Sequence, residues 1–225
     1  MLLVHDLMLL LLDDESGRQR PVAALTELLG GALLVELAAA GVVGVAAKSE
    51  PGDIKEGRLV LRPGVPVLAG LLEEAARIVG EYVGKKPDRA LRSLGKGLRE
   101  RVTADLVEAG ILAEQEHKTL GLFRSTRHPA VSTTYEDDLR ARLAAVLEGQ
   151  AGPEEKTGPL IALLHASGQL PKIIPVHDKK QAKAIATKIS EGNWAAASVR
   201  RAVQAGQTAA IVATTFAATA AAINN

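Results

Sequence analysis

The first twelve residues, MLLVHDLMLLLL, are aliphatic at nearly every position and constrain the fold more than any other segment. They resemble the apolar part of a signal peptide. However, they lack a basic start, include His5 and Asp6, and run into Asp13 with no small-residue cleavage site. The segment is therefore predicted to be a helix that is buried in the protein interior.

The rest of the composition is consistent with an aliphatic core. Hydrophobic residues make up 47% of the 225 residues but aromatic residues only 2%, so Leu, Val, Ile and Ala must fill the interior. Residues 209–223 are apolar too, but they are fewer than the roughly 20 that a membrane span needs. They are predicted to form a last core helix, and membrane contact, if present, is expected to be peripheral.

Charge and chemical groups exclude several classes of function. The net charge of +1 disfavours a general polyanion binder, so anion binding is expected at one local patch. The absence of Cys removes disulfides, thiolate nucleophiles and Cys metal sites. The histidines lack metal-ligand spacing, and the chain has no phosphate loop, complete dinucleotide fingerprint or serine elbow. No catalytic residue, metal or cofactor is expected.

Hydrophobic periodicity predicts a mainly α protein: a single compact domain over residues 1–225, with a central helix bundle, a β-hairpin and short β insertions. Helices are predicted at 22–40, 67–83, 96–109, 135–147, 160–166, 179–190, 194–205 and 208–223, with a short one from Arg89. Residues 42–47 and 58–61 are predicted short strands, and 111–113 is predicted to pair with 119–123 across a turn at 115–118.

The segment 91–131 contains the strongest functional signal. Arg92, Lys96 and Arg99 follow one another at spacings of four and three, so one helical face is predicted to carry all three cations. The predicted apolar strand contains Leu120, Leu122 and Phe123. Cations beside an apolar hairpin suit an anionic membrane surface. The other reading of these cations is an ordinary solvated helix face.

Two further functions fit the same segment. Helix, strand, turn and strand is also the outline of a winged helix, in which the helix enters a DNA groove. An apolar second strand is unsuited to phosphate contact, but Arg124 and Arg127 keep this alternative open. The third alternative is a protein adaptor whose basic face meets an acidic partner.

Several motifs occur in order along nearly the whole chain. They are LLVELAAAGVV (33–43), LRERVTADLVEAGIL (98–112), LGLF and RHP within 120–129, and LIALLHAS (160–167). Together they resemble the Golgi phosphoprotein 3-like family, which includes a yeast vacuolar-sorting homologue and bacterial relatives. The Ala-rich, aromatic-poor composition suggests a bacterial member.

The resemblance implies a compact, mainly helical fold with a β-hairpin and a non-enzymatic function. Eukaryotic members bind phosphatidylinositol 4-phosphate and act as adaptors that retain glycosyltransferases. Their headgroup pocket uses two basic residues three apart, which correspond to Lys96 and Arg99. Its Trp position falls at about Pro21 and its Arg position at Gly30, so this chain keeps half of the pocket.

The expected partners follow from the same resemblance. An anionic, phosphoinositide-like phospholipid is expected at Lys96 and Arg99, assisted by Arg92 or by a residue near Arg18 and Arg20. The hairpin residues Leu120, Leu122 and Phe123 are expected to contact a membrane or a second copy of the chain. Protein clients are a further expectation, nucleic acid is not, and the expected location is cytoplasmic and peripherally membrane-associated.

Overall fold

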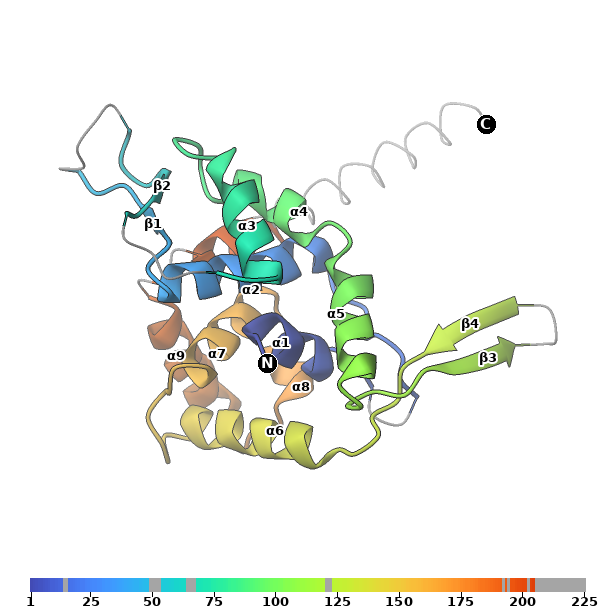
Figure 1. The fold of residues 1–225 in the computed structure, drawn as a ribbon. Coiled ribbons are helices and arrows are strands. Elements are labelled where there is room, and N and C mark those ends of the chain that lie inside the picture. The colour runs from blue at the N-terminus through green and yellow to red at the C-terminus, as the bar shows by residue number, and fades with distance from the viewer. Residues whose placement is uncertain are drawn as a thin grey trace, which may run out of the picture.

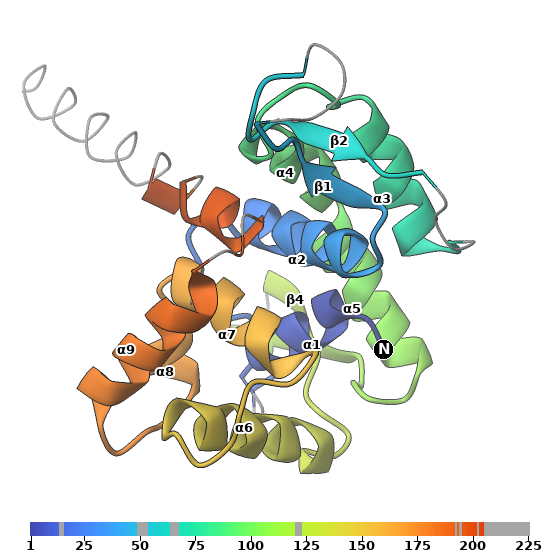
Figure 2. The same cartoon turned by 90° about the vertical axis from the view of Figure 1, so that its left-hand side faces the viewer.

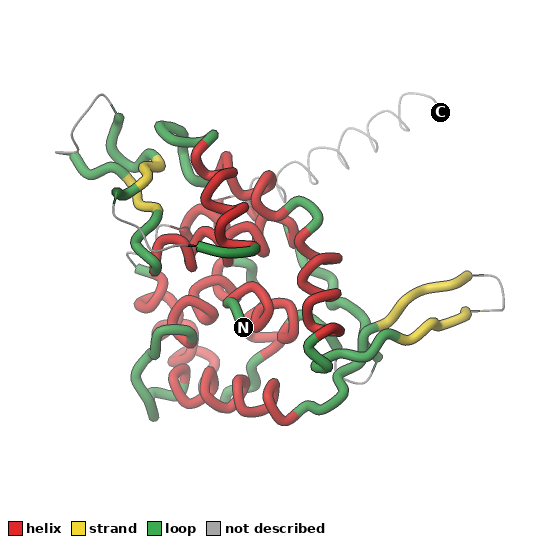
Figure 3. The backbone as a smooth tube through the Cα atoms, viewed as in Figure 1, coloured by secondary structure: helices red, strands yellow, loops and turns green. Residues whose placement is uncertain are grey.

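Helices dominate the computed structural model, as the sequence predicts (Figure 3). It describes residues 1–13, 16–48, 54–63, 68–119, 123–191, 193, 195–201 and 203–204, without the side chains of 116–119 and 123–125. The predicted helix 208–223 lies outside these residues. In the described part of the chain, no helix has the length and apolarity that crossing a bilayer requires.

Figure 1 shows the order of the elements. The helices are α1 (Leu3–Leu10), α2 (Leu25–Ala39), α3 (Leu71–Gly80), α4 (Asp88–Gly95), α5 (Leu98–Glu108), α6 (Thr134–Leu147), α7 (Thr157–Ala166), α8 (Leu170–Ile173) and α9 (Lys179–Ser190), and residues 195–201 are also helical. The strands are β1 (Val43–Val45), β2 (Leu59–Leu61), β3 (Gln115–Thr119) and β4 (Phe123–Arg127). Most predicted helices are confirmed to within a few residues.

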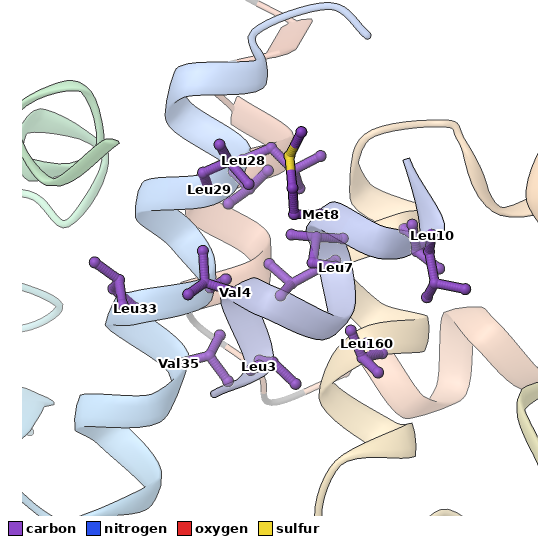
Figure 4. Packing of buried hydrophobic residues seen from close by; sticks show 14 of the residues in the cluster. Leu3, Val4, Leu7, Met8, Leu10, Leu28, Leu29, Leu33, Val35 and Leu160 are labelled. Carbon is purple, nitrogen blue, oxygen red and sulfur yellow. The ribbon is translucent and has the colours of Figure 1, made fainter. Parts of the chain in front are cut away.

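Helix α1 is at the centre of the molecule, and all of its residues are buried. Its side chains pack among those of α2 and α7, as Leu7, Leu28 and Leu160 illustrate (Figure 4). Each fully buried Leu stabilises the fold by roughly 1.5–3 kcal/mol relative to an exposed one. The prediction of a buried first helix is confirmed.

The two polar residues of α1 are buried with partners. Asp6 accepts a hydrogen bond from the Tyr135 hydroxyl at 2.7 Å and lies 3.4 Å from the Lys156 ammonium. Burial, together with the bond to Asp6, raises the pKa of Tyr135 to about 12. His5 lies 3.2 Å from the Asp105 carboxylate. These contacts allow polar groups to remain in an otherwise aliphatic helix, because buried polar groups need partners.

Helices α2 and α4 cross at very short range through two glycines. A Cβ at Gly30 would lie 2.1 Å from the Leu91 carbonyl oxygen, and one at Gly95 would lie 1.7 Å from the Thr26 carbonyl oxygen. Only residues without a side chain allow this approach. The crossing closes position 30 to any larger residue.

Each of the two described sheets is an antiparallel pair of strands, β1–β2 (Figure 2) and β3–β4 (Figure 1). The pair β1–β2 confirms the short strands predicted near 42–47 and 58–61. The predicted turn at 115–118 is wrong, because these residues belong to β3, which pairs with β4 from Gln115↔Arg127 to Thr119↔Phe123. Of the predicted strand 111–113, Leu112 makes only an isolated bridge with Ala130.

The hairpin β3–β4 projects away from the helices (Figure 1). A projecting hairpin does not need an apolar face toward the core, so its strand sequences QEHKT and FRSTR can be mostly polar. The prediction of an apolar strand at 119–123 is therefore wrong for its described residues, since Thr119 ends β3 and Phe123 begins β4. Leu120 and Leu122 lie outside the described residues.

Candidate functional site: an open basic cavity

An open cavity of about 1330 Å³ lies where α2, α5, α8 and β4 meet. Five cationic side chains from separate parts of the chain line it: Arg18, Arg20, Arg99, Arg127 and Lys172. None of the described lining residues is Asp or Glu. A concave surface lined by one sign of charge concentrates the field and attracts anions.

The segment after α1 positions Arg18 and Arg20. It folds back on the end of α1, with an antiparallel bridge between Leu12 and Gln19. The Asp13 amide donates to the Arg18 carbonyl at 2.9 Å, and the Arg20 amide donates to the Leu11 carbonyl at 2.8 Å. Residues two apart in extended backbone project on the same side, which brings both arginines to the cavity.

Arg20 is held in place more firmly than the other cations. Its Nε donates to the Leu12 carbonyl at 3.3 Å, and its guanidinium lies 3.6 Å from the Asp13 carboxylate. Hydrogen bonds from the Ser16 hydroxyl and amide lower the pKa of Asp13. Asp13 therefore stays ionised and offsets part of the Arg20 charge.

The segment that contains Arg18 is fastened to the base of the hairpin. The His128 amide donates to the Gly17 carbonyl at 3.1 Å. Gly17 has a φ of +58°, and a Cβ there would lie 2.3 Å from the Pro129 nitrogen, so only glycine fits. This crossing brings Arg18 and Arg127 to the same cavity although more than a hundred residues separate them in sequence.

The remaining cations come from α5, β4 and α8. Arg99 lies in the first turn of α5 and is exposed, and Arg127 ends β4. Lys172 lies on α8, next to the turn with Ser167 and Gln169 that also lines the cavity. Arg18, Arg99, Arg127 and Lys172 have no acidic partner among the described residues. No acidic side chain in the described part of the chain competes with an anion for their donors.

The structure separates the three cations that the sequence predicts on one helical face. The predicted helix 96–109 begins only at Leu98, because Lys96 is extended (ψ 120°) and Gly97 has a φ of +73°. Arg92 belongs to α4, and its Nε donates to Glu27 at 3.0 Å. The expectation of a shared helical face is therefore wrong, and of the three only Arg99 lines the basic cavity.

Lys96 lines another, smaller cavity of about 220 Å³ beside Glu74 and Arg101. Arg101 comes two residues after Arg99 and so lies on another side of α5. It forms an ion pair with Glu74 of the neighbouring helix α3. The carboxylate beside Lys96 makes this smaller cavity a poorer place for an anion than the basic one.

In the resembled family, a Trp and an Arg complete the headgroup pocket. The corresponding positions in this chain, Pro21 and Gly30, differ in their surroundings. Pro21 lines the basic cavity. Gly30 does not, because it is buried against Leu91 of α4 with no room for a side chain. A cation at position 30 is incompatible with this helix crossing. The other cations of the cavity come instead from the loop after α1, from β4 and from α8.

The chemistry available in the cavity is anion binding. Guanidinium groups donate paired hydrogen bonds to phosphate oxygens, and an ammonium group adds a point charge. Among the described residues, no group of three His, Asp or Glu side chains could hold a metal ion. The described lining residues of this cavity include no carboxylate or imidazole that could act as a base.

Fold and cavity together define a class: a mainly helical protein with an arginine-rich basic cavity at the base of a projecting hairpin. The family model for Golgi phosphoprotein 3 (GPP34) matches residues 3–206, so the chain belongs to this family. No curated protein matches the chain.

Proposed function

We propose that this protein is a non-enzymatic peripheral membrane adaptor that binds an anionic phospholipid headgroup in the basic cavity. The observation that carries the proposal is the convergence of five cations on a cavity whose described lining residues include no carboxylate. Family membership adds support, because the resemblance implies a headgroup-binding adaptor. Arg99 is the predicted site residue retained in this proposal, and Arg18, Arg20, Arg127 and Lys172 are its companions.

A phosphorylated headgroup is the anion that best fits this set of donors. Four of the five cations are arginines, whose planar guanidinium groups match phosphate oxygens in pairs. The cavity volume of about 1330 Å³ has room for an inositol ring, and Ser167 and Gln169 add polar lining beside the cations. Cations at several angles can meet more than one phosphate, so a phosphoinositide should bind more tightly than a monophosphate lipid.

The hairpin extends this site toward a membrane. Thr126 and Arg127 line the cavity at the hairpin's base, and β4 begins at Phe123 at its far end. Leu120 and Leu122, between the strands in sequence, are proposed with Phe123 to contact the acyl region or a second copy of the chain. The proposed location is the cytoplasmic surface of a membrane.

Vesicle co-sedimentation at low salt tests the proposal. Phosphatidylcholine vesicles alone are compared with vesicles that contain phosphatidylinositol 4-phosphate, phosphatidylinositol or cardiolipin. The wild-type protein should sediment with anionic vesicles, most strongly with the phosphoinositide. In Arg18→Ala/Arg99→Ala, affinity should fall about 100-fold, because two charge-assisted hydrogen bonds are each worth roughly 1.5 kcal/mol or more.

Arg77→Ala/Arg89→Ala is the matched control, since it removes the same charge at exposed positions outside the cavity. This control should keep nearly all of the binding. No sedimentation with any anionic vesicle, or equal losses in both variants, would contradict the proposal. Duplex DNA is included as a competitor, because Arg124 and Arg127 could also contact the phosphates of nucleic acid. Stronger binding to DNA than to vesicles would favour the winged-helix alternative.

A further inference from the structure

A second cavity lies across α8 from the basic one and differs from it in character. It has a volume of about 580 Å³ and is lined by residues of α7, α8, α9 and the segment between α8 and α9, and by Leu147 at the end of α6. Its floor is apolar, with Leu147, Leu170, Ile174 and Ala182 almost completely buried. The volume is within the usual range for a small-molecule site.

Two lysines and a histidine are the charged or titratable groups among its described lining residues. Lys179 and Lys183 are one turn apart on α9, both exposed and without an acidic partner among the described residues. The Nε2 atom of His165 lies 3.4 Å from the Thr187 hydroxyl. Burial, with Arg200 and Lys183 nearby, lowers the pKa of His165, so this imidazole is neutral near pH 7.

We infer that this cavity binds a free, single-chain fatty carboxylate, with the chain against the apolar floor and the carboxylate at Lys179 and Lys183. Leu147 and Ile174 offer aliphatic contact but no hydrogen-bonding groups for a polar body. The lysines at the mouth supply a charge opposite to that of a carboxylate. Burial is the main cause of the lowered pKa of His165, and the positive charges of Arg200 and Lys183, which add to it, also favour an anion.

The chemistry of the mouth distinguishes this ligand from a phospholipid headgroup. No arginine is among the described residues that line this cavity, so the paired donors that suit phosphate are absent from its lining. A lysine ammonium is a compact point charge that a single carboxylate can satisfy. The inference concerns a different cavity from the proposed headgroup site and does not depend on it.

Isothermal titration calorimetry with dodecanoate, below its micelle concentration, tests the inference on the full chain. Saturable binding at one site is expected, at least tenfold tighter than for octanoate and for dodecanol. Lys179→Gln/Lys183→Gln should weaken dodecanoate binding at least tenfold. The matched control is Lys180→Gln/Lys188→Gln, which removes the same charge from α9 at positions outside the cavity lining and should change the affinity less than threefold.

Three results would overturn the inference: no saturable dodecanoate binding, equal binding of dodecanol, or equal losses in the two lysine pairs. The variant Arg18→Ala/Arg99→Ala separates the two cavities and should bind dodecanoate as the wild type does. If it loses dodecanoate as well, the fatty acid occupies the basic cavity and the assignment to α9 is wrong. A vesicle-binding failure with intact dodecanoate binding would remove only the proposed headgroup function.

Discussion

The two cavities on either side of α8 share one described lining residue, Gly168, yet their linings differ in charge and polarity. The basic cavity gathers its five described cations from four separate segments and is wide and polar. The apolar cavity takes both of its lysines from a single helix and has an aliphatic floor. The comparison shows that a net charge of +1 can hide a local concentration of cations, because opposite charges elsewhere cancel it.

The type of cation is the second difference. Arginines prevail in the basic cavity, whereas lysines alone supply the cationic charge of the described apolar lining. Arginine recognises planar or phosphate oxygens in pairs, while lysine neutralises a single charge. The ligand proposed for each cavity follows from this difference and from the character of the walls.

The largest expected effect concerns the stability of the protein and Gly30 of α2, where the close helix crossing leaves no room for a cation. Gly30→Ala should destabilise the protein by about 1–3 kcal/mol, because its Cβ would meet the Leu91 carbonyl in a packed interior. The melting temperature should fall by roughly 2–12 °C. Gly152→Ala is the control, because no atom lies within 4 Å of a Cβ there. An unchanged melting temperature would mean that position 30 has room for a side chain.

Exchange of the cation types tests the contrast between arginine and lysine. Arg99→Lys should weaken phosphoinositide binding about tenfold, since one charge-assisted hydrogen bond of roughly 1.5 kcal/mol is lost while the charge remains. Lys183→Arg should change dodecanoate binding less than threefold, because a single carboxylate needs only the charge. Calorimetry measures both. Equal effects of the two exchanges would remove the distinction drawn between the cavities.

The smallest expected effect is a dependence of folding stability on pH, which arises from His165 in the lining of the apolar cavity. The folded state lowers the pKa of His165 below its ordinary value of 6.5, so the unfolded chain takes up the proton first. The resulting stability is fully present above pH 6.5 and declines as pH falls from there to the folded pKa. Denaturant titrations should show this decline, and His165→Gln should reduce it. An identical decline in the variant would contradict the assignment.

Much of the fold could be predicted from the sequence because local patterns determine it. The apolar run around Leu7 and the periodicity of 179–190 predict helices that the structure contains. Local patterns could not predict the hairpin register. Residues 115–118 are polar, which favours a turn, but they form a strand because a projecting hairpin needs no apolar face toward the core. The break between α4 and α5 depends on the backbone at Lys96 and Gly97, which periodicity does not detect.

The basic cavity was only partly accessible from the sequence. Arg99 could be named from the resemblance, and a helping residue could be expected either at Arg92 or near Arg18 and Arg20, both of which line the cavity. Lys172 carries no local signal, since its place depends on how α8 packs beside the loop after α1. Tertiary structure alone assembles cations from such distant segments into one site.

The most direct test of the headgroup site is an NMR titration with the soluble headgroup inositol 1,4-bisphosphate. Saturable shifts are expected at residues 18–22, 99, 126–127 and 167–172, around the basic cavity, and they should vanish in Arg18→Ala/Arg99→Ala. Residues 179–183 of the apolar cavity should not shift. No saturable shift, or shifts centred on Arg92 and Lys96 instead, would contradict the account.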